Sequence, residues 1–304
     1  MPTTRRKFII NTAMLTGAAA LGMSFAPKKA PKLSFSTLGC PDWDFNTIVD
    51  FAAKNNYRGI EIRGIQRQMD LTLCKEFSKE NIAATKEQLT KNNLRIINLG
   101  ASANLHTAEP KERKKNLDEA KRFIDLASEL NCPYIRVFPN NLPKDSAKEE
   151  ALQLISNGLI ELGNYSKDKN VRVLMETHGD LVHTKDLITV MQAAKFAHVG
   201  LVWDVCNMWV ITKESPKQVY QQLKPWIHHT HIKDAVLKDG NPNYVLLGKG
   251  EVPIFEAIDV LRKNNYKGYY SFEWEKLWHP EILEPEVAIA DYPVAMNKHF
   301  NNEK

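Results

Sequence analysis

Short apolar runs alternate with longer, partly polar segments along most of the chain. The runs are rich in Val, Ile, Leu and aromatic residues, which is typical of strands buried on both faces. Eight of them lie at residues 32–38, 59–63, 95–100, 134–138, 171–176, 200–204, 227–232 and 269–273. Between them apolar residues recur at helical spacing, most clearly at 117–130 and 151–162. The pattern therefore predicts eight strands separated by helices.

Strands that alternate with helices favour an α/β fold, and eight such units in ~275 residues fit a single (β/α)8 TIM barrel. The competing architecture is a doubly wound open sheet, which usually has fewer strands. A dinucleotide-binding sheet of that kind would carry a G-x-G-x-x-G turn after its first strand, and the chain contains none. Because no Pro-rich or Ser-rich linker interrupts the pattern, we expect one domain spanning residues 27–304.

The N-terminal segment has the pattern of an export signal. Arg5 and Arg6 precede an apolar run that reaches Phe25, and residues 24–26 suit cleavage by a signal peptidase. We expect residues 1–26 to be a twin-arginine signal peptide and the protein to be periplasmic. The alternative is a cytoplasmic protein with an amphipathic first helix, but this run is apolar on all sides. No later run approaches the ~20 apolar residues of a membrane span, so we expect no stable membrane anchor.

Net charge and cysteine spacing exclude several classes of partner and site. The formal charge is +5, and removing the N-terminal signal, which has three basic and no acidic residues, lowers it to +2. A nearly balanced chain gives no electrostatic support for nucleic-acid binding. No C-x-x-C pair occurs among the four cysteines, which excludes a zinc knuckle. A disulfide framework is not expected in a domain of this size.

A carboxylate or imidazole side chain lies at the end of each of four consecutive predicted strands. These residues are Glu176, Asp204, His231 and Glu273. Active sites of (β/α)8 barrels lie at the C-terminal ends of the strands, so these side chains should converge. Alone, each has an ordinary structural explanation as a helix cap, a solvated turn or a hydrogen-bonded histidine. Together, three carboxylates would repel one another unless a divalent cation lay between them. The ligand types suit Mn²⁺, with Mg²⁺, Co²⁺, Fe²⁺ or Zn²⁺ as alternatives.

Four motifs give the chain a recognisable resemblance. They are H-x-H-I-K-D at 229–234, L-G-K-G-E-V-P at 247–253, G-I-E-I-R at 59–63 and Y-I-R-V-F at 134–138. The chain resembles the xylose-isomerase-like sugar isomerase/epimerase superfamily, which also contains inositol-catabolism dehydratases and apurinic endonucleases. The resemblance implies that a Glu, an Asp, a His and a Glu from strands 5 to 8 bind the metal. These fall on Glu176, Asp204, His231 and Glu273.

Three histidines lie close together in the seventh predicted strand. Side chains alternate along a strand, so His229 and His231 should share one face while His228 faces the helices. His231 is nearest the C-terminal end of the strand and is the expected ligand. We expect His229 one layer deeper, beside the ligands or in the barrel core, and His228 to be structural.

The resemblance also implies a reaction. A metal that holds a ketose carbonyl and the neighbouring hydroxyl would stabilise an enediolate, with Glu176 and Glu273 as base and acid. Proton exchange on opposite faces gives epimerisation, and transfer between adjacent carbons gives isomerisation. A second hypothesis is a lyase that cleaves 3-keto-glycosides by β-elimination at the same site. A third is a sugar-binding protein without activity.

Other polar residues are expected to shape the substrate pocket. They are Arg136, His178, Asn207, Lys233 and His106. Arg136 matches a family arginine. Its side chain would either donate a hydrogen bond to a sugar hydroxyl or form a structural ion pair. Asn207 stands where many epimerases have a His, which argues against a multi-metal site of the endonuclease type. With no Gly-rich phosphate cradle or Arg cluster, we expect a small neutral carbohydrate as substrate. The sequence contains no indication of oligomeric state.

Overall fold

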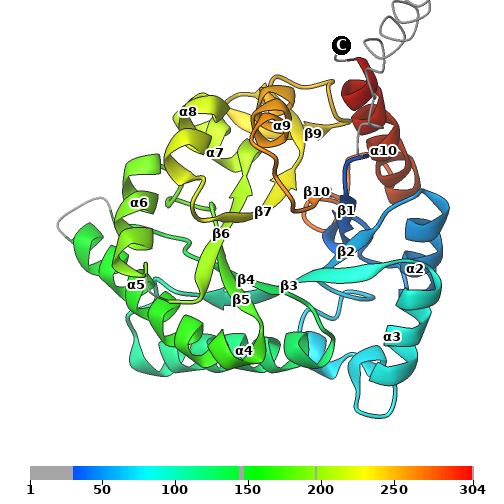
Figure 1. Ribbon diagram of the computed structural model, residues 1–304. Coiled ribbons are helices and arrows are strands. Elements are labelled where there is room, and N and C mark those ends of the chain that lie inside the picture. The colour runs from blue at the N-terminus through cyan, green and yellow to red at the C-terminus, as the bar shows by residue number, and fades with distance from the viewer. Residues whose placement is uncertain (1–29, 144–146, 196, 303–304) are drawn as a thin grey trace, which may run out of the picture. The chain divides into compact units, whose positions relative to one another are not determined.

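The computed structural model describes residues 30–143, 147–195 and 197–302 (Figure 1). The described residues from Pro31 onward form one compact unit. The expected signal peptide at residues 1–26 lies outside the described residues.

The described residues contain a closed barrel of eight parallel strands in the order β1-β10-β7-β6-β5-β4-β3-β2. The strands are β1 (Leu33–Ser36), β2 (Gly59–Ile62), β3 (Arg95–Asn104), β4 (Tyr134–Phe138), β5 (Arg172–Glu176), β6 (Val199–Asp204), β7 (Ile227–Ile232) and β10 (Tyr270–Phe272). Figure 1 views this barrel along its axis, from the N-terminal ends of the strands. Each strand corresponds to one predicted run, so the expected (β/α)8 TIM barrel is confirmed.

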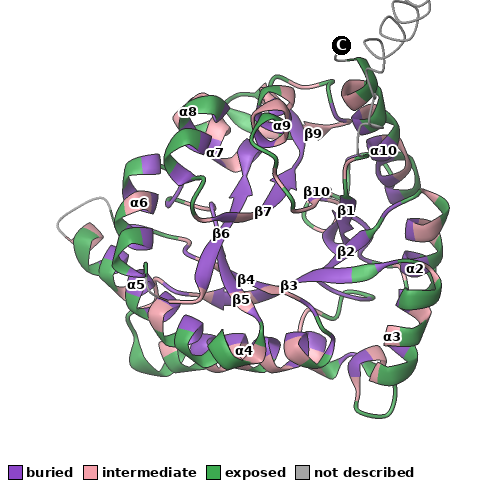
Figure 2. Ribbon diagram, viewed as in Figure 1, coloured by how far each residue is buried: buried purple, intermediate pink, exposed green. Residues whose placement is uncertain are grey.

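Helices surround the barrel and bury their inner faces against it, while their outer faces are exposed (Figure 2). They are α2 (Phe45–Lys54), α3 (Ile82–Lys91), α4 (Pro110–Glu129), α5 (Ala147–Ser166), α6 (Thr184–Ala193), α7 (Val205–Thr212), α8 (Pro216–Leu223), α9 (Ile254–Lys263) and α10 (Pro285–Asn302). Short 3-10 helices are η1 (Thr37–Gly39), η2 (Leu71–Leu73), η3 (Lys75–Phe77) and η4 (Lys167–Lys169). Among the described helices, none has the length and apolar composition needed to cross a membrane.

An antiparallel hairpin, β8 (Asp234–Lys238) and β9 (Asn241–Val245), is inserted after β7. The sequence analysis did not predict these two strands. Their alternation is weak because most positions of the hairpin are only half-buried: Asp234 and Ala235 are buried, and the others are intermediate or exposed.

Asp234 ties this hairpin to the loop that follows it. Its carboxylate accepts hydrogen bonds from the backbone N–H groups of Ala235 (2.9 Å), Gly248 (2.8 Å), Gly250 (3.0 Å) and Val252 (3.3 Å). A buried carboxylate with four donors is strongly held. The two motifs that contain these residues are therefore parts of one structural unit.

Replacing Gly250 with Ala should destabilise the protein by about 1–3 kcal/mol, because a Cβ there would lie 2.2 Å from Asp234 Oδ1 and 2.5 Å from the Ala235 carbonyl oxygen. Urea unfolding measures the effect. Gly240→Asn is the control: it lies in the turn of the neighbouring hairpin, has open space around it, and has a left-handed backbone that Asn tolerates. A Gly250→Ala protein as stable as the control would contradict the expectation.

The strand pairing is irregular at His228. Leu201 pairs with Ile227 and the next residue, Val202, pairs with His229, so His228 is the extra residue of a β-bulge. Its ring does not face a helix, as simple alternation predicted. It lies against Tyr134 and over Gly200, where a Cβ would come within 2.3 Å of it. The bulge turns this side chain toward neighbouring strands.

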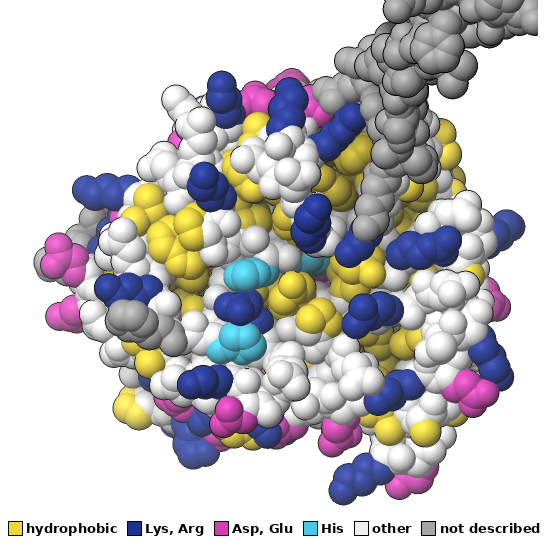
Figure 3. Space-filling model, in the orientation of Figure 1, with side chains coloured by type: hydrophobic (Ala, Val, Ile, Leu, Met, Phe, Trp, Pro, Cys, Tyr) yellow, Lys and Arg dark blue, Asp and Glu magenta, His cyan; other side chains and the backbone are white. Residues whose placement is uncertain are grey.

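His228 should make stability sensitive to acid. Burial, followed by the positive charges of Arg172 and His198, lowers the pKa of His228 to about 4. Histidine side chains lie among Lys and Arg side chains near the centre of the face in Figure 3. Between pH ~6.5 and ~4 the unfolded chain binds a proton there and the folded chain does not, so stability falls as pH falls through that window.

The contribution should amount to about 1–3 kcal/mol. Denaturant unfolding at pH 7 and pH 4.5 should show a smaller loss of stability for His228→Gln than for the unchanged protein. Equal losses in the two proteins would show that another group is responsible.

Candidate metal centre

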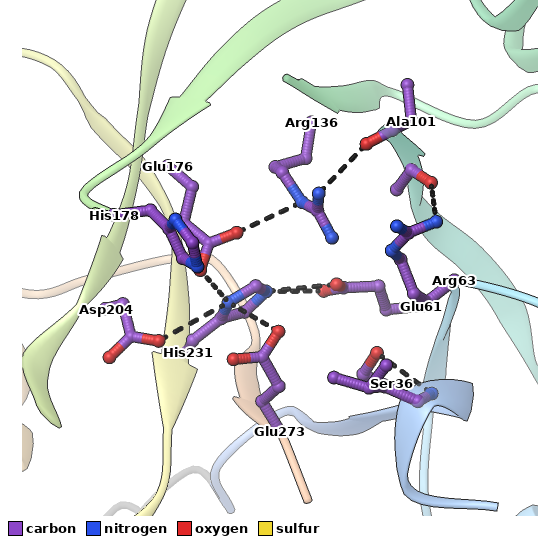
Figure 4. Close-up of polar contacts among 12 residues, drawn as sticks. Ser36, Glu61, Arg63, Ala101, Arg136, Glu176, His178, Asp204, His231 and Glu273 are labelled. Carbon is purple, nitrogen blue, oxygen red and sulfur yellow. Dashed lines mark hydrogen bonds and ion pairs between the residues drawn. The ribbon is translucent and has the colours of Figure 1, made fainter. Parts of the chain in front are cut away.

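Four side chains from four neighbouring strands converge at the C-terminal end of the barrel (Figure 4). They are Glu176 at the end of β5, Asp204 at the end of β6, His231 in β7 and Glu273 directly after β10. One ligand atom from each lies within 4.8 Å of all the others. All four residues are buried. The structure thus brings together the four residues expected from the sequence.

His231 is at the centre of this cluster. Its Nδ1 atom is 3.1 Å from Glu273 Oε1, 3.4 Å from Glu176 Oε1 and 3.8 Å from Asp204 Oδ2. This Nδ1 is buried, and its contacts with these carboxylates are ion pairs that lack hydrogen-bond geometry among the described residues. A buried nitrogen of this kind, faced by three carboxylates, has the donor set of a divalent-metal site.

Glu61 was missed in the sequence analysis. It lies in the middle of β2 and is fully buried. Its carboxylate is 3.0 Å from His231 Nε2 and 2.7 Å from His229 Nε2. The available sequence signal was a charged residue inside the apolar run 59–63, since carboxylates are rarely buried without a partner.

Lys233 was expected to contact substrate, but the structure places it among acidic residues. Its Nζ is 2.5 Å from Glu273 Oε2, 2.5 Å from Glu275 Oε1 and 2.8 Å from Asp204 Oδ2. The side chain is 1% exposed, so these carboxylates occupy its donors. Glu275 is the second residue that the sequence analysis did not single out.

Arg136 lies on the other side of Glu176. Its Nε is 3.1 Å from Glu176 Oε2, and its Nη1 donates to the carbonyl of Ala101 at 2.9 Å. Its guanidinium also lies 3.8 Å from the centre of the Phe138 ring. Gly100 makes this possible, because a Cβ at that position would lie 3.0 Å from Arg136 Nη2. Of the two explanations considered for Arg136, the ion pair is present.

The remaining expected pocket residues, His178, His106 and Asn207, are half-buried. His178 Nδ1 is 2.9 Å from Asn140 Oδ1, and burial lowers the pKa of His178, which favours the neutral ring. His106 is also half-buried, and burial lowers its pKa. Asn207 contacts the centre through its backbone: its N–H donates to Asp204 Oδ1 at 2.8 Å, which caps helix α7.

The carboxylates differ in their electrostatic surroundings. Burial raises the pKa of both Glu176 and Glu273, but His231 together with Arg136 or Lys233 outweighs burial and holds each below its ordinary value. Burial, aided by these two glutamates, raises the pKa of Asp204 to about 7 despite Lys233.

The pKa values of His231 and of its partner on β2, Glu61, shift in opposite directions. Burial lowers the pKa of His231, but the negative charges of Glu273, Glu61 and Glu176 raise it well above its ordinary value. Burial raises the pKa of Glu61, and His231 and His229 outweigh it to give a net lowering. In the absence of a metal, a protonated His231 therefore balances the carboxylates, and a divalent cation at Nδ1 would replace that proton.

Comparison with known proteins places the barrel among enzymes. A 3-dehydroshikimate dehydratase of Bacillus anthracis is 23% identical over 262 residues, which cover 81% of this chain and 90% of that protein. The structure of the Escherichia coli 3-keto-D-glucoside 4-epimerase YcjR is similar in fold, with a TM-score of 0.69, 16% identity and coverage of 88% and 99% of the two chains.

Another similar structure is the IOLI protein with a binding zinc atom. Its TM-score is 0.71, with 16% identity and coverage of 88% of this chain and 96% of that one. The sequence profile described as xylose isomerase-like TIM barrel matches residues 49–291. The match spans most of the barrel, and the chain belongs to the xylose isomerase-like TIM barrel family.

Proposed function

We propose that this protein is a divalent-metal-dependent sugar isomerase or epimerase. One observation carries the proposal: the buried Nδ1 of His231 faces the carboxylates of Glu176, Asp204 and Glu273 at 3.1–3.8 Å. Three oxygens and one imidazole nitrogen suit Mn²⁺ among the divalent cations. A protein of similar fold is described with a bound zinc atom, which supports a divalent metal in this barrel.

The metal's contribution is to polarise a ketone oxygen and the adjacent hydroxyl, which acidifies the hydrogen on the carbon between them. Glu176 and Glu273 then move that proton. Each has one oxygen facing His231 Nδ1 and the other held by a cation, Arg136 for Glu176 and Lys233 for Glu273. Their lowered pKa values keep both carboxylates ionised and able to accept a proton.

The substrate we propose is a small neutral carbohydrate. Lys233 and Arg136 are paired with carboxylates, which leaves no arginine or lysine of this set for a phosphate group. His178, Asn207 and His106 are half-buried and would offer hydrogen bonds to sugar hydroxyls. The twin-arginine pattern supports action in the periplasm, and fractionation of cells that express the full chain tests that location.

A second candidate is cleavage of a 3-keto-glycoside by β-elimination. It begins with abstraction of the same kind of proton, beside a ketone, and ends with loss of the group at the next carbon. One similar protein, named as a dehydratase, supports an elimination, and another, named as an epimerase of a 3-keto-D-glucoside, supports this class of substrate but not its cleavage. Removal of the proton leaves a carbanion in both reactions. In the first candidate the carbanion takes up a proton again, and in the second it expels the group at the next carbon.

Nuclear magnetic resonance in D₂O distinguishes these reactions. The Mn²⁺-loaded protein is incubated with free ketoses and with 3-keto-glycosides. Deuterium at a carbon beside the ketone of an intact, inverted sugar supports epimerisation. Release of the aglycone supports elimination. If neither class of sugar exchanges hydrogen while Mn²⁺ is bound, the protein is not an enzyme of this type, and sugar binding without exchange would support the non-catalytic alternative.

A further inference from the structure

The interior of the barrel beneath the metal centre is polar. Glu61 crosses it from β2 toward β7, and Ser271 Oγ lies 3.3 Å from Glu61 Oε2. Ser34 is the register partner of Ser271, and Asn98 is the partner of Glu61, so both side chains face the same interior. Polar atoms of Ser34 and Asn98 are buried without a hydrogen-bond partner among the described residues.

Burying a charged carboxylate such as that of Glu61 is costly unless it is paired and hydrogen-bonded. The two imidazoles are the strongest partners of the Glu61 carboxylate. His229 approaches one oxygen at 2.7 Å, while His231 Nε2 is 3.0 Å from Oε1 and 3.1 Å from Oε2. An ionised carboxylate only accepts hydrogen bonds, so each Nε2 must be the protonated nitrogen. When a metal displaces the second proton of His231, the lone pair that becomes free is therefore the one on Nδ1.

Glu61, His229 and His231 also form a second group with metal-ligand spacing. A cation there would require His231 to bind through Nε2. A cation at the upper centre requires Nδ1 of the same ring, and a neutral imidazole has only one free lone pair. The two sites are therefore exclusive. The three carboxylates around Nδ1 make the upper position the stronger one.

We propose that Glu61 is a positioning residue for the metal centre. It fixes His231 in the Nε2–H form and fixes its ring plane, so that the Nδ1 lone pair faces Glu176, Asp204 and Glu273. His229 holds the second oxygen of Glu61 and keeps that carboxylate in place. The inference rests on the proposed function, because it assumes that a metal binds at Nδ1. A carboxylate, a histidine and a metal in series are a common arrangement in metalloproteins.

Two substitutions of Glu61 test the role by isothermal titration of Mn²⁺ into the full chain after removal of bound metal. Glu61→Gln keeps the shape but can present an amide donor to Nε2, which favours the wrong tautomer. Glu61→Asp keeps the charge and withdraws it by one methylene. Both dissociation constants should rise, by about 10–100-fold for Glu61→Gln and less for Glu61→Asp. Ser271→Ala is the matched control: its hydroxyl donates to the same carboxylate, and its backbone pairs with His231 in the sheet. Because the substitution keeps the backbone and removes no group bonded to the imidazole ring, the constant should change less than about threefold.

A direct measurement of the tautomer needs no variant. Long-range ¹H–¹⁵N spectra of the Zn²⁺-loaded protein should show the proton of His231 on Nε2, assigned by the signal missing in His231→Asn. If Glu61 were purely structural, Glu61→Gln would lower the melting temperature of the metal-free protein and leave the Mn²⁺ dissociation constant unchanged.

Three outcomes are separable. A folded Glu61→Gln protein with an unchanged Mn²⁺ constant, or a proton on Nδ1 of His231, overturns the role of Glu61. If the unchanged protein binds no divalent metal, the proposed function itself fails.

Discussion

Glu176→Gln should lower the rate of hydrogen exchange into the sugar by about 10³-fold or more, equivalent to about 4 kcal/mol in the barrier. The amide cannot accept the proton, while its oxygen retains the shape of the ligand. Arg136 Nε, 3.1 Å from Glu176 Oε2, would keep the side chain in place. The rate is followed in D₂O at saturating Mn²⁺, with metal content measured in the same samples. Glu87→Gln, an exposed position on α3, is the control for the chemical change alone.

The companion variant Glu273→Gln makes this test sharper. If the two glutamates act on opposite faces of the substrate, each single variant should still exchange hydrogen into one epimer without converting it into the other. The two variants should retain opposite epimers. Full conversion by either variant at the normal rate would show that its glutamate does not move the proton.

Lys233→Met should destabilise the metal-free protein by about 3–5 kcal/mol, because it removes the cation from three buried carboxylates. Those carboxylates belong to Asp204, Glu273 and Glu275, at 2.5–2.8 Å from Nζ. For a domain of this size the melting temperature should fall by about 6–20 °C. Circular dichroism during heating, with and without Mn²⁺, measures the change.

A double variant separates lost charge from lost packing. Glu275→Gln removes one of the carboxylates that Lys233 neutralises and is not one of the four expected metal ligands. Combining it with Lys233→Met should restore part of the lost stability. If the double variant is less stable than Lys233→Met alone, then Glu275 contributes through contacts other than this ion pair.

The fold could be predicted because it depends on patterns within short stretches of the sequence. Eight apolar runs separated by amphipathic segments determine the barrel, and two of the strands match their predicted bounds, Tyr134–Phe138 and Ile227–Ile232. The four clustered residues followed from the rule that barrel sites form at strand C-termini. Their convergence is observed, whereas metal binding by them stays a prediction.

The features that were missed depend on contacts between distant segments. Glu61 is 170 residues from His231 in sequence, and its partner is visible only when the barrel closes. Glu275 acquires its role only because Lys233 turns inward from another strand. The bulge at His228 breaks strict alternation, so its orientation could not follow from a two-residue period.

Asp204 illustrates a wider consequence of this architecture. One of its oxygens caps α7, and its backbone N–H donates to Thr177 Oγ1 at 2.9 Å, so the end of β6 is joined to β5 and to a helix. The entropy lost in fixing this ligand is therefore lost during folding, before any cation arrives. Metal uptake should then require no backbone rearrangement at β6, and the apo and metal-loaded barrels should have nearly the same backbone there.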